Sequence, residues 1–209
     1  MITTKMEMVE YQLKKRGVTD PRVINAMLEV DRDLFVPEEL MDRAYEDGPL
    51  PIGKGQTISQ PYIVGYMAEK LMLDKESTVL EVGTGCGYNA AVLSRIASHI
   101  YSVEIIEWLA DLARENLSKA GIENVSVRAG NGYDGWPEKA PFDAVVLTAA
   151  AAKIPQPLKQ QLKVGGRLLA PVGETIQHLI LFEKIDQDSF EETEFLPVKF
   201  VPMTGESNN

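Results

Sequence analysis

Three closely spaced glycines mark the stretch of this chain best suited to hold a ligand. Gly83, Gly85 and Gly87 follow a short apolar run, residues 78–82, which predicts a buried strand. Glycine lets the backbone turn tightly and come close to a bound molecule. A dinucleotide-binding turn has the pattern Gly-x-Gly-x-x-Gly, and here the third glycine stands one position early. The spacing disfavours a nicotinamide-dependent oxidoreductase and leaves a turn that binds nothing as the alternative.

Acidic residues stand near the ends of the first two predicted strands. Glu81 lies two positions before Gly83, and Glu104 ends the apolar run 100–104. A carboxylate at the end of the second strand of a parallel sheet can accept hydrogen bonds from both hydroxyls of a ribose. We therefore expect Glu104 to bind the ribose of an adenosine, with a solvated glutamate at a strand end as the alternative.

A third turn, Gly130-Asn131-Gly132, follows a predicted strand at 125–129. The carbonyl oxygen of Asn131 can accept a hydrogen bond from the amino group of an adenine, and a simple turn is the alternative. A Gly-x-Gly-x-Gly turn preceded by an acidic residue resembles that of Rossmann-like methyltransferases that use S-adenosylmethionine. Many of these enzymes carry Asp at the position of Asn131, and we expect the amide to serve the same purpose.

Strands alternate with helices in the second part of the chain. This alternation predicts an α/β fold with a doubly wound, mostly parallel sheet. Two last strands separated by the polar turn 186–189 predict an antiparallel C-terminal edge. The expected strands cover 78–82, 100–104, 125–128, 142–147, 167–170, 177–184 and 195–201, and the expected helices cover 89–96, 107–119 and 155–162.

The first 77 residues are predicted to form helices and loops. One helix should end at Gly17, a second should begin at Asp20 with Pro21 in its first turn, and a third should cover 61–70. Prolines and glycines interrupt residues 35–56, which predicts a long loop with one short helix at 38–42. We expect residues 1–77 to pack as an N-terminal helical extension on a Rossmann-like core of 78–209, within one compact domain.

Composition excludes several classes of partner and site. The net charge of −10 repels phosphate backbones and disfavours nucleic acid as a partner. The basic triplet that ends at Arg16 is interpreted as a solvated helix end. No apolar run reaches the roughly 18 residues of a membrane-spanning helix, and no secretory signal is evident. Cys86 is the single cysteine, and His99 and His178 lie far apart, so we expect a cytoplasmic protein with no disulfide and no metal site.

The chain resembles the protein-L-isoaspartate O-methyltransferase family over residues 6–205. The most specific match is Gly55-Gln56-Thr57-Ile58-Ser59-Gln60-Pro61-Tyr62. Further matches are the stretch 80–91, Ala140-Pro141-Phe142-Asp143-Ala144, Thr148-Ala149-Ala150-Ala151, the stretch 161–168, Pro171-Val172-Gly173 and Phe200-Val201-Pro202-Met203-Thr204. Cys86 stands where the family more often has Ser, and Asn131 stands where it usually has Asp.

The resemblance implies a protein repair enzyme. Such an enzyme methylates the free α-carboxylate of L-isoaspartyl residues in damaged proteins and peptides, using S-adenosylmethionine and leaving S-adenosylhomocysteine. The methyl ester then closes to a succinimide, whose hydrolysis restores some normal aspartate. We expect a monomer. The alternatives are a Rossmann-like methyltransferase for another carboxylate or a small molecule, and a module that binds the cofactor without catalysis.

The resemblance also implies roles for individual residues. It places Ser59 where cofactor and isoaspartyl carboxylate meet, and it places Thr57, Ile58, Val172 and Val201 along the peptide groove. A carboxylate with an ordinary pKa of about 4 is ionised at neutral pH, so Ser59 is expected to position it, with no general base required. From the residues alone, Ser59 would instead cap the helix that begins at Pro61. The implied cofactor-binding residues are Gly55, Gln56, Thr57, Glu81, Gly83, Thr84, Gly85, Gly87, Glu104, Ile105, Asn131, Gly132 and Thr204.

Overall fold

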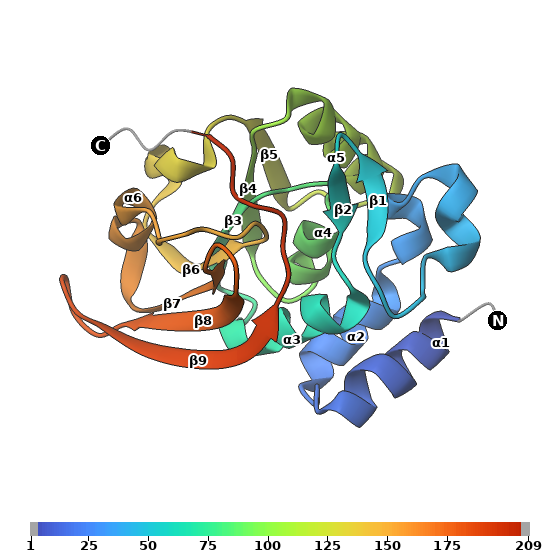
Figure 1. Cartoon of the computed structure of the whole chain (residues 1–209), viewed down its shortest axis with the longest axis horizontal. Helices are drawn as coiled ribbons and strands as arrows, with labels where there is room; N and C mark the ends of the chain where they lie inside the picture. Colours follow the sequence, from blue (N-terminus) through green and yellow to red (C-terminus); the bar gives the residue numbers. More distant parts are fainter. Residues whose placement is uncertain (1–3, 206–209) are drawn as a thin grey trace.

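A seven-stranded sheet forms the centre of the computed structural model, which describes residues 4–205. The strand order is β5-β4-β3-β6-β7-β8-β9, so the chain order reverses between β3 and β6 (Figure 1). Neighbouring strands from β5 to β7 in this order are parallel to each other. Strand β8 runs antiparallel to β7, and β9 runs antiparallel to β8. This confirms the predicted Rossmann-like sheet with an antiparallel C-terminal edge. The strands are β3 (Thr78–Val82), β4 (His99–Glu104), β5 (Val125–Ala129), β6 (Phe142–Leu147), β7 (Leu162–Val172), β8 (Gln177–Lys184) and β9 (Phe190–Val198).

Helices cover both faces of the sheet because alternate strand residues point to opposite sides. Val79 and Val146 belong to one buried cluster, while Leu80 and Val145 belong to the other. The first cluster packs under α2 (Pro21–Glu29), α3 (Pro61–Leu71), α4 (Tyr88–Ser94) and α5 (Glu107–Lys119), and the second packs under α6 (Gln156–Gln160). Burial on both faces explains why β3 and β6 are continuous apolar runs in the sequence.

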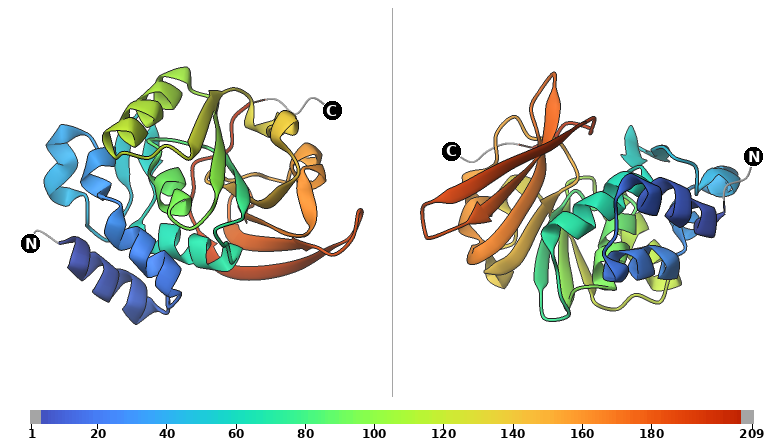
Figure 2. Two further views of the ribbon diagram at one scale, coloured as in Figure 1. Left: turned by 180° about the vertical axis from the view of Figure 1, so that it is seen from behind. Right: turned by 90° about the horizontal axis from the view of Figure 1, so that it is seen from below.

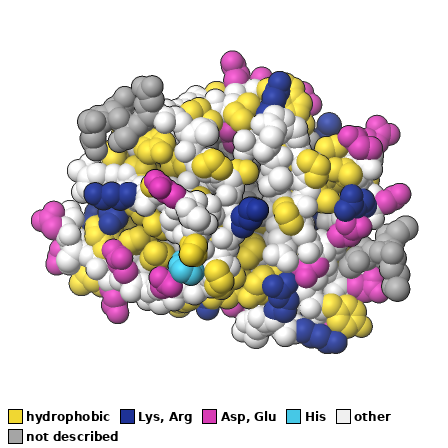
Figure 3. Space-filling model, viewed as in Figure 1, with side chains coloured by type: hydrophobic (Ala, Val, Ile, Leu, Met, Phe, Trp, Pro, Cys, Tyr) yellow, Lys and Arg dark blue, Asp and Glu magenta, His cyan; other side chains and the backbone are white. Residues whose placement is uncertain are grey.

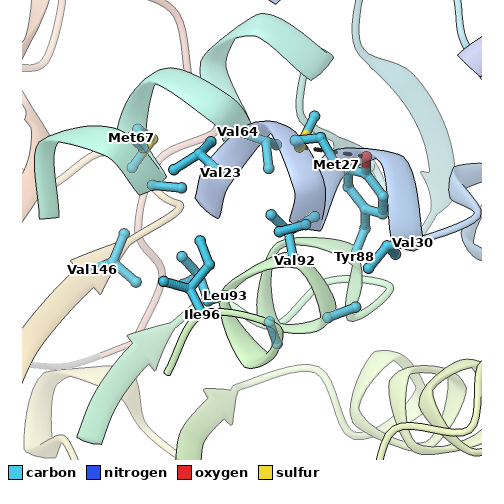
Figure 4. Close-up of a cluster of buried hydrophobic side chains, with 14 of the residues drawn as sticks. Val23, Met27, Val30, Val64, Met67, Tyr88, Val92, Leu93, Ile96 and Val146 are labelled. Atoms are coloured by element: carbon cyan, nitrogen blue, oxygen red, sulfur yellow. Dashed lines mark hydrogen bonds between the residues drawn. The ribbon is translucent and has the colours of Figure 1, made fainter. Parts of the chain in front are cut away.

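The N-terminal helices belong to the larger of these clusters. Figure 4 shows Val23 and Met27 of α2 close to Val64 of α3 and Val92 of α4. The Tyr88 hydroxyl at the start of α4 donates to the Met27 sulfur at 3.8 Å, which links the two helices further. Residues on either side of position 78 thus share one apolar core.

The first helix is irregular but ends where expected. It starts as α1 (Lys5–Glu7), continues as a π-helical turn over Met8–Leu13 and ends in a 3-10 turn before Gly17. Gly17 has a φ of 89°, the left-handed conformation typical of a helix end. Asp20 caps α2 by accepting a hydrogen bond from the backbone N–H of Arg22, as predicted.

The stretch 35–56 contains more structure than the loop predicted for it. After two 3-10 helices, Arg32–Phe35 and Glu38–Arg43, the chain forms the antiparallel hairpin of β1 (Leu50–Gly53) and β2 (Gln56–Ile58). Lys54 and Gly55 make the turn with φ values of 53° and 72°. The predicted short helix at 38–42 is confirmed by the helix Glu38–Arg43, whereas the loop prediction missed the hairpin because Pro51 and the turn glycines hid two strands of three or four residues.

Two C-terminal strands begin earlier than predicted. β7 starts at Leu162 instead of 167, since Gly165 and Gly166 bend the strand without ending it. β9 covers Phe190–Val198 instead of 195–201. The residues after Val198 leave the sheet and cross the carboxyl ends of the strands, where the N–H of Met203 donates to the carbonyl of Ala150 at 2.7 Å. We call residues 199–204 the C-terminal strap.

The N-terminal helices and the β8–β9 hairpin lie on opposite sides of the central strands, as Figure 1 and the right view of Figure 2 both show. Helix α3 nevertheless reaches the C-terminal strands, since the rings of Tyr66 and Phe195 lie 6.0 Å apart. Within the described part of the chain, no helix combines the length and apolar character needed to cross a membrane.

Candidate active site

A pocket lies at the carboxyl ends of β3 and β4, beside the point where the strand order reverses. This is the edge where open α/β sheets bind ligands. We call it the inner pocket. Its walls come from three parts of the chain that Figure 1 shows converging: β2 with the residues after it, the turns after the central strands, and the C-terminal strap. The lining residues are Gln56–Ser59, Val64, Val82–Cys86, Tyr88, Asn89, Val103–Ile106, Gly132, Thr148, Ala149 and Val201–Thr204.

The glycine turn has backbone geometry that only glycine adopts without strain. Gly83, Gly85 and Gly87 have φ values of 99°, 56° and 91°. A Cβ on Gly83 would also overlap the Thr148 hydroxyl, which donates hydrogen bonds to the carbonyls of Gly83 and Val82. The turn therefore needs glycine for its shape and for the close approach of the loop that follows β6.

Glu104 presents a fixed carboxylate to the inner pocket. Only 5% of the residue is exposed, and its two oxygens accept hydrogen bonds from the N–H of Gly85 at 2.8 Å and the N–H of Ile106 at 3.0 Å. Each carboxylate oxygen can accept a further bond, so hydroxyl groups of a ligand can still bind. Ile105 lies beside it, half exposed, and offers an apolar surface to a flat ring.

Glu81 lies behind the inner pocket and does not line it, contrary to the expectation of direct cofactor contact. Its fully buried carboxyl accepts hydrogen bonds from the Ser102 hydroxyl and from the Asn89 side chain at 2.8 Å. Burial raises the pKa of Glu81 to about 7, although both hydrogen bonds oppose the shift. Through these partners it holds Asn89, and through Ser102 it holds Thr84, whose hydroxyl lies 2.6 Å from that of Ser102. Asn89 and Thr84 are the ones that line the pocket.

Four other expected site residues also lie outside the lining. Gly55 occupies the exposed hairpin turn, and Gly87 precedes α4 and faces Ala113 and Leu117. Val172 packs against the second apolar cluster at the end of β7. Asn131 caps a short 3-10 helix, where its carbonyl oxygen accepts the N–H of Tyr133 at 3.2 Å. Local backbone demands thus account for the two glycines and Asn131, and apolar packing accounts for Val172.

Ser59 lies at a boundary between two hollows. It follows β2, and the cap position of α3 is Gln60, so the hydroxyl of Ser59 does not serve as the helix cap. That hydroxyl makes no hydrogen bond to any of residues 4–205. Besides the inner pocket, Ser59 lines a second hollow, which we call the outer groove. The residues shared by the two are Thr57, Ser59, Thr148 and Val201.

The outer groove brings together residues that sequence reasoning missed. The Arg16 guanidinium lies 3.6 Å from the centroid of the Tyr62 ring, and both line the groove. Arg16 is exposed at a helix end, as predicted, but it also forms part of the wall of the groove. Thr148 was also missed as a site residue, although it begins the segment Thr148-Ala149-Ala150-Ala151 that follows β6. The groove is lined by Arg16, Pro49, Thr57, Ser59, Gln60, Tyr62, Ile63, Thr148 and Leu196–Val201.

The two histidines lie apart from both hollows. His99 in β4 contacts the Ser126 hydroxyl at 2.9 Å, and His178 in β8 lies 3.5 Å from Glu194. Burial lowers the pKa of His99, and the positive charge of Lys139 adds to this effect. In the part of the chain that the structure describes, no three His, Cys, Asp or Glu side chains form a group that could hold a metal ion.

Comparison with known sequences identifies a family pattern that covers nearly the whole chain. The pattern of protein-L-isoaspartate(D-aspartate) O-methyltransferases matches residues 3–208. A protein-L-isoaspartate O-methyltransferase of Synechococcus sp. (strain JA-2-3B'a(2-13)) is 52% identical over 205 residues, which cover 94% of this chain and 84% of the relative.

Solved structures give the same result. A protein-L-isoaspartate O-methyltransferase superposes with a TM-score of 0.90 at 33% identity, covering 98% of this chain and 67% of the other. A Plasmodium falciparum chain described as an enzyme of this kind, in complex with S-adenosyl-L-homocysteine, superposes with a TM-score of 0.84 at 27% identity. The superposed region covers 96% of this chain and 97% of the Plasmodium falciparum chain.

Proposed function

Because this chain belongs to the protein-L-isoaspartate(D-aspartate) O-methyltransferase family, we propose that its inner pocket binds S-adenosylmethionine and its outer groove binds an isoaspartyl peptide. The activity is methylation of isoaspartyl residues, which initiates repair of damaged proteins. In this proposal the methyl group passes from one hollow to the other at their common wall, formed by Thr57, Ser59, Thr148 and Val201.

The inner pocket has the donors and acceptors that the cofactor requires. Glu104 offers carboxylate oxygens to the ribose hydroxyls, and Ile105 offers an apolar surface to the adenine. Gly83 and Gly85 have no side chain, so a ligand can approach their backbone closely. Their positive φ values of 99° and 56° are ones that glycine adopts without strain. When bound, S-adenosylmethionine supplies a methyl group already activated by attachment to a positively charged sulfur.

One observation supports the assignment of catalysis to Ser59: it lies where the two hollows share a wall and its hydroxyl is not engaged. Thr148 stands at the same wall, but its hydroxyl donates to the carbonyl of Gly83. Thr57 is the third hydroxyl there, and it is more exposed than Ser59. Ser59 is therefore the best placed donor to one oxygen of the substrate carboxylate, which leaves the other oxygen directed at the inner pocket.

Alignment and exclusion of water are the contributions required of the protein. The substrate carboxylate is already anionic at neutral pH, so no base has to remove a proton. Holding two reactants in line can contribute about 7–11 kcal/mol at best. Ile58 and Val201 place apolar surface at the junction, which strips water from the carboxylate.

Oligomeric state and location belong to the same proposal. In this proposal the active unit is a monomer. The only cysteine, Cys86, is buried and unpaired, as is usual in a reducing compartment, and this supports a cytoplasmic location.

Methyl transfer to matched peptides tests the proposed function. The protein is incubated with radiolabelled S-adenosylmethionine and two peptides that differ only in an isoaspartyl or an aspartyl residue. We expect base-labile label on the isoaspartyl peptide alone. Label on neither peptide would contradict the repair function, and label on a small carboxylic acid in a parallel incubation would then favour the alternative methyltransferase.

A further inference from the structure

The charged side chains that line the outer groove are all basic. Arg16 stands on the wall from the N-terminal helix, and Lys199 stands on the wall from the C-terminal strap. Asp and Glu do not occur among the described residues that line it. Tyr62, Ile63 and Phe200 contribute apolar surface between them. On the face drawn in Figure 3, a basic side chain lies near the centre among hydrophobic and uncharged ones.

Arg16 is held on the wall of the outer groove by its neighbours. Its Nη1 lies 3.2 Å from each carboxylate oxygen of Asp47, and its guanidinium stacks on Tyr62. Asp47 also accepts a hydrogen bond from the Gln60 side chain at 2.7 Å, which connects Arg16 to the residue after Ser59. Nε and Nη2 of Arg16 make no hydrogen bond within residues 4–205, so two nitrogens remain to donate to a ligand.

Lys199 carries a positive charge that is not balanced locally. It is exposed and forms no ion pair with any of the described residues. Val201, two residues further along the strap, belongs to the wall shared with the inner pocket. An extended chain rises about 3.3 Å per residue, so the Cα atoms of Lys199 and Val201 lie within about 7 Å of each other.

The range of electrostatic forces determines which charges a bound peptide experiences. The net charge of −10 repels an acidic peptide at long range. At an ionic strength of about 0.15 M, however, charges further apart than about 8 Å are largely screened. Residues that flank an isoaspartyl group at Ser59 therefore respond mainly to the groove itself. There Asp47 partly balances Arg16, and Lys199 adds a positive charge with no ion-pair partner among the described residues.

We propose that the outer groove selects isoaspartyl peptides that carry an acidic side chain next to the isoaspartyl residue, and that Arg16 and Lys199 select them. This inference rests on the proposed function, because it takes the outer groove to be the peptide site. Partly exposed ion pairs contribute modestly, so we expect a preference of about two- to fivefold in kcat/KM.

Two isoaspartyl peptides that differ only in Glu or Gln beside the isoaspartyl residue test the selection. The native protein should methylate the Glu peptide with the higher kcat/KM at about 0.15 M salt. The ratio should approach one at about 1 M salt, where the screening length falls to about 3 Å. Arg16→Gln and Lys199→Gln should each lower the ratio, whereas Arg16→Lys should largely keep it.

Lys75→Gln provides the matched control, since Lys75 is exposed in the loop before β3 and outside both hollows. This variant should keep the ratio of the native protein. Because the ratio compares two peptides on one enzyme preparation, a variant with less folded protein still reports selectivity. Equal kcat/KM for the two peptides in the native protein overturns the inference, as does a ratio that survives in both Gln variants. Methylation of neither peptide would instead contradict the proposed function.

Discussion

The hydroxyl of Thr148 donates a hydrogen bond to the carbonyl oxygen of Gly83, at the wall that the inner pocket shares with the outer groove. This bond fixes the loop after β6 against the glycine turn after β3. The glycine turn that indicates the cofactor is therefore in direct contact with the wall where methyl transfer is proposed to take place.

Gly83→Ala should weaken cofactor binding without unfolding the protein. The new methyl group would overlap the Thr148 hydroxyl, and the φ of 99° would strain an alanine by about 1–3 kcal/mol. Calorimetry should show the Kd for S-adenosylmethionine raised by about 10-fold or more. Gly48→Ala is the control, because nothing lies within 4 Å of the added Cβ and its φ is not in the left-handed region. An unchanged Kd in Gly83→Ala would contradict the close packing.

Ser59→Ala should slow methyl transfer far more than it weakens cofactor binding. A hydrogen bond to a charged group contributes about 1.5–3 kcal/mol, so kcat should fall by about 10- to 100-fold. Steady-state kinetics with an isoaspartyl peptide, together with calorimetry for the cofactor, separate the two effects. Ser118→Ala, on the exposed face of α5, is the control. Equal losses in kcat and cofactor affinity would assign Ser59 to the fold or the cofactor instead.

Glu104→Gln should raise the Kd for S-adenosylmethionine by about 10-fold or more. The neutral side chain has the shape of glutamate, but it loses charge-assisted bonds to the ribose and can no longer accept from both Gly85 and Ile106. Glu115→Gln removes the same charge from the exposed face of α5 and serves as the control in calorimetry. If both variants bind the cofactor as the native protein does, Glu104 does not hold the ribose.

Glu81→Gln should change how stability depends on pH. The folded protein keeps the Glu81 proton up to about pH 7, whereas the ordinary pKa is 4.5. Between these values the folded state binds more protons, so the free energy of unfolding falls as pH rises, by at most about 3 kcal/mol. Glutamine removes this loss. In thermal melts at about pH 8, the Tm of the variant should rise relative to that of the native protein. This difference in Tm should shrink as the pH is lowered towards about 5.

Glu123→Gln, at an exposed position, controls for the change in net charge in these melts. A difference between Glu81→Gln and the native protein that stayed constant from about pH 5 to about pH 8 would show that Glu81 does not titrate in this range. A loss of stability at every pH would show that both oxygens of Glu81 are needed, one to accept from Ser102 and the other from Asn89, since glutamine has a single side-chain oxygen.

The central strands could be predicted from the sequence because burial on both faces leaves a plain signal. Residues 78–82 and 142–147 are uniformly apolar except at Thr78, Glu81 and Asp143, and their predicted bounds match β3 and β6. The same burial explains why Glu81 was misplaced. Its side chain points into the protein, and periodicity in a strand buried on both faces does not reveal which side holds the ligand.

Features that depend on contacts between distant segments could not be predicted in this way. The packing of Arg16 on Tyr62 joins two helices that are separated in sequence by α2, two 3-10 helices and the β1–β2 hairpin, and the local sequence of either gives no sign of it. The β1–β2 hairpin was hidden by Pro51 and Gly53, which are read as loop residues. For Ser59, the residues alone favoured a helix cap, and the placement of the cap at Gln60 leaves its hydroxyl available.

The inner pocket takes its walls from β2, from the centre of the chain and from the C-terminal strap, so a bound cofactor would fasten parts of the chain that are far apart in sequence. Opening either the hairpin or the strap would then require breaking contacts to the ligand. Binding to the folded state alone stabilises it in proportion to the logarithm of ligand concentration. The cellular concentration of S-adenosylmethionine would thus set how often the β1–β2 hairpin and the C-terminal strap unfold locally, and how readily a protease cuts them.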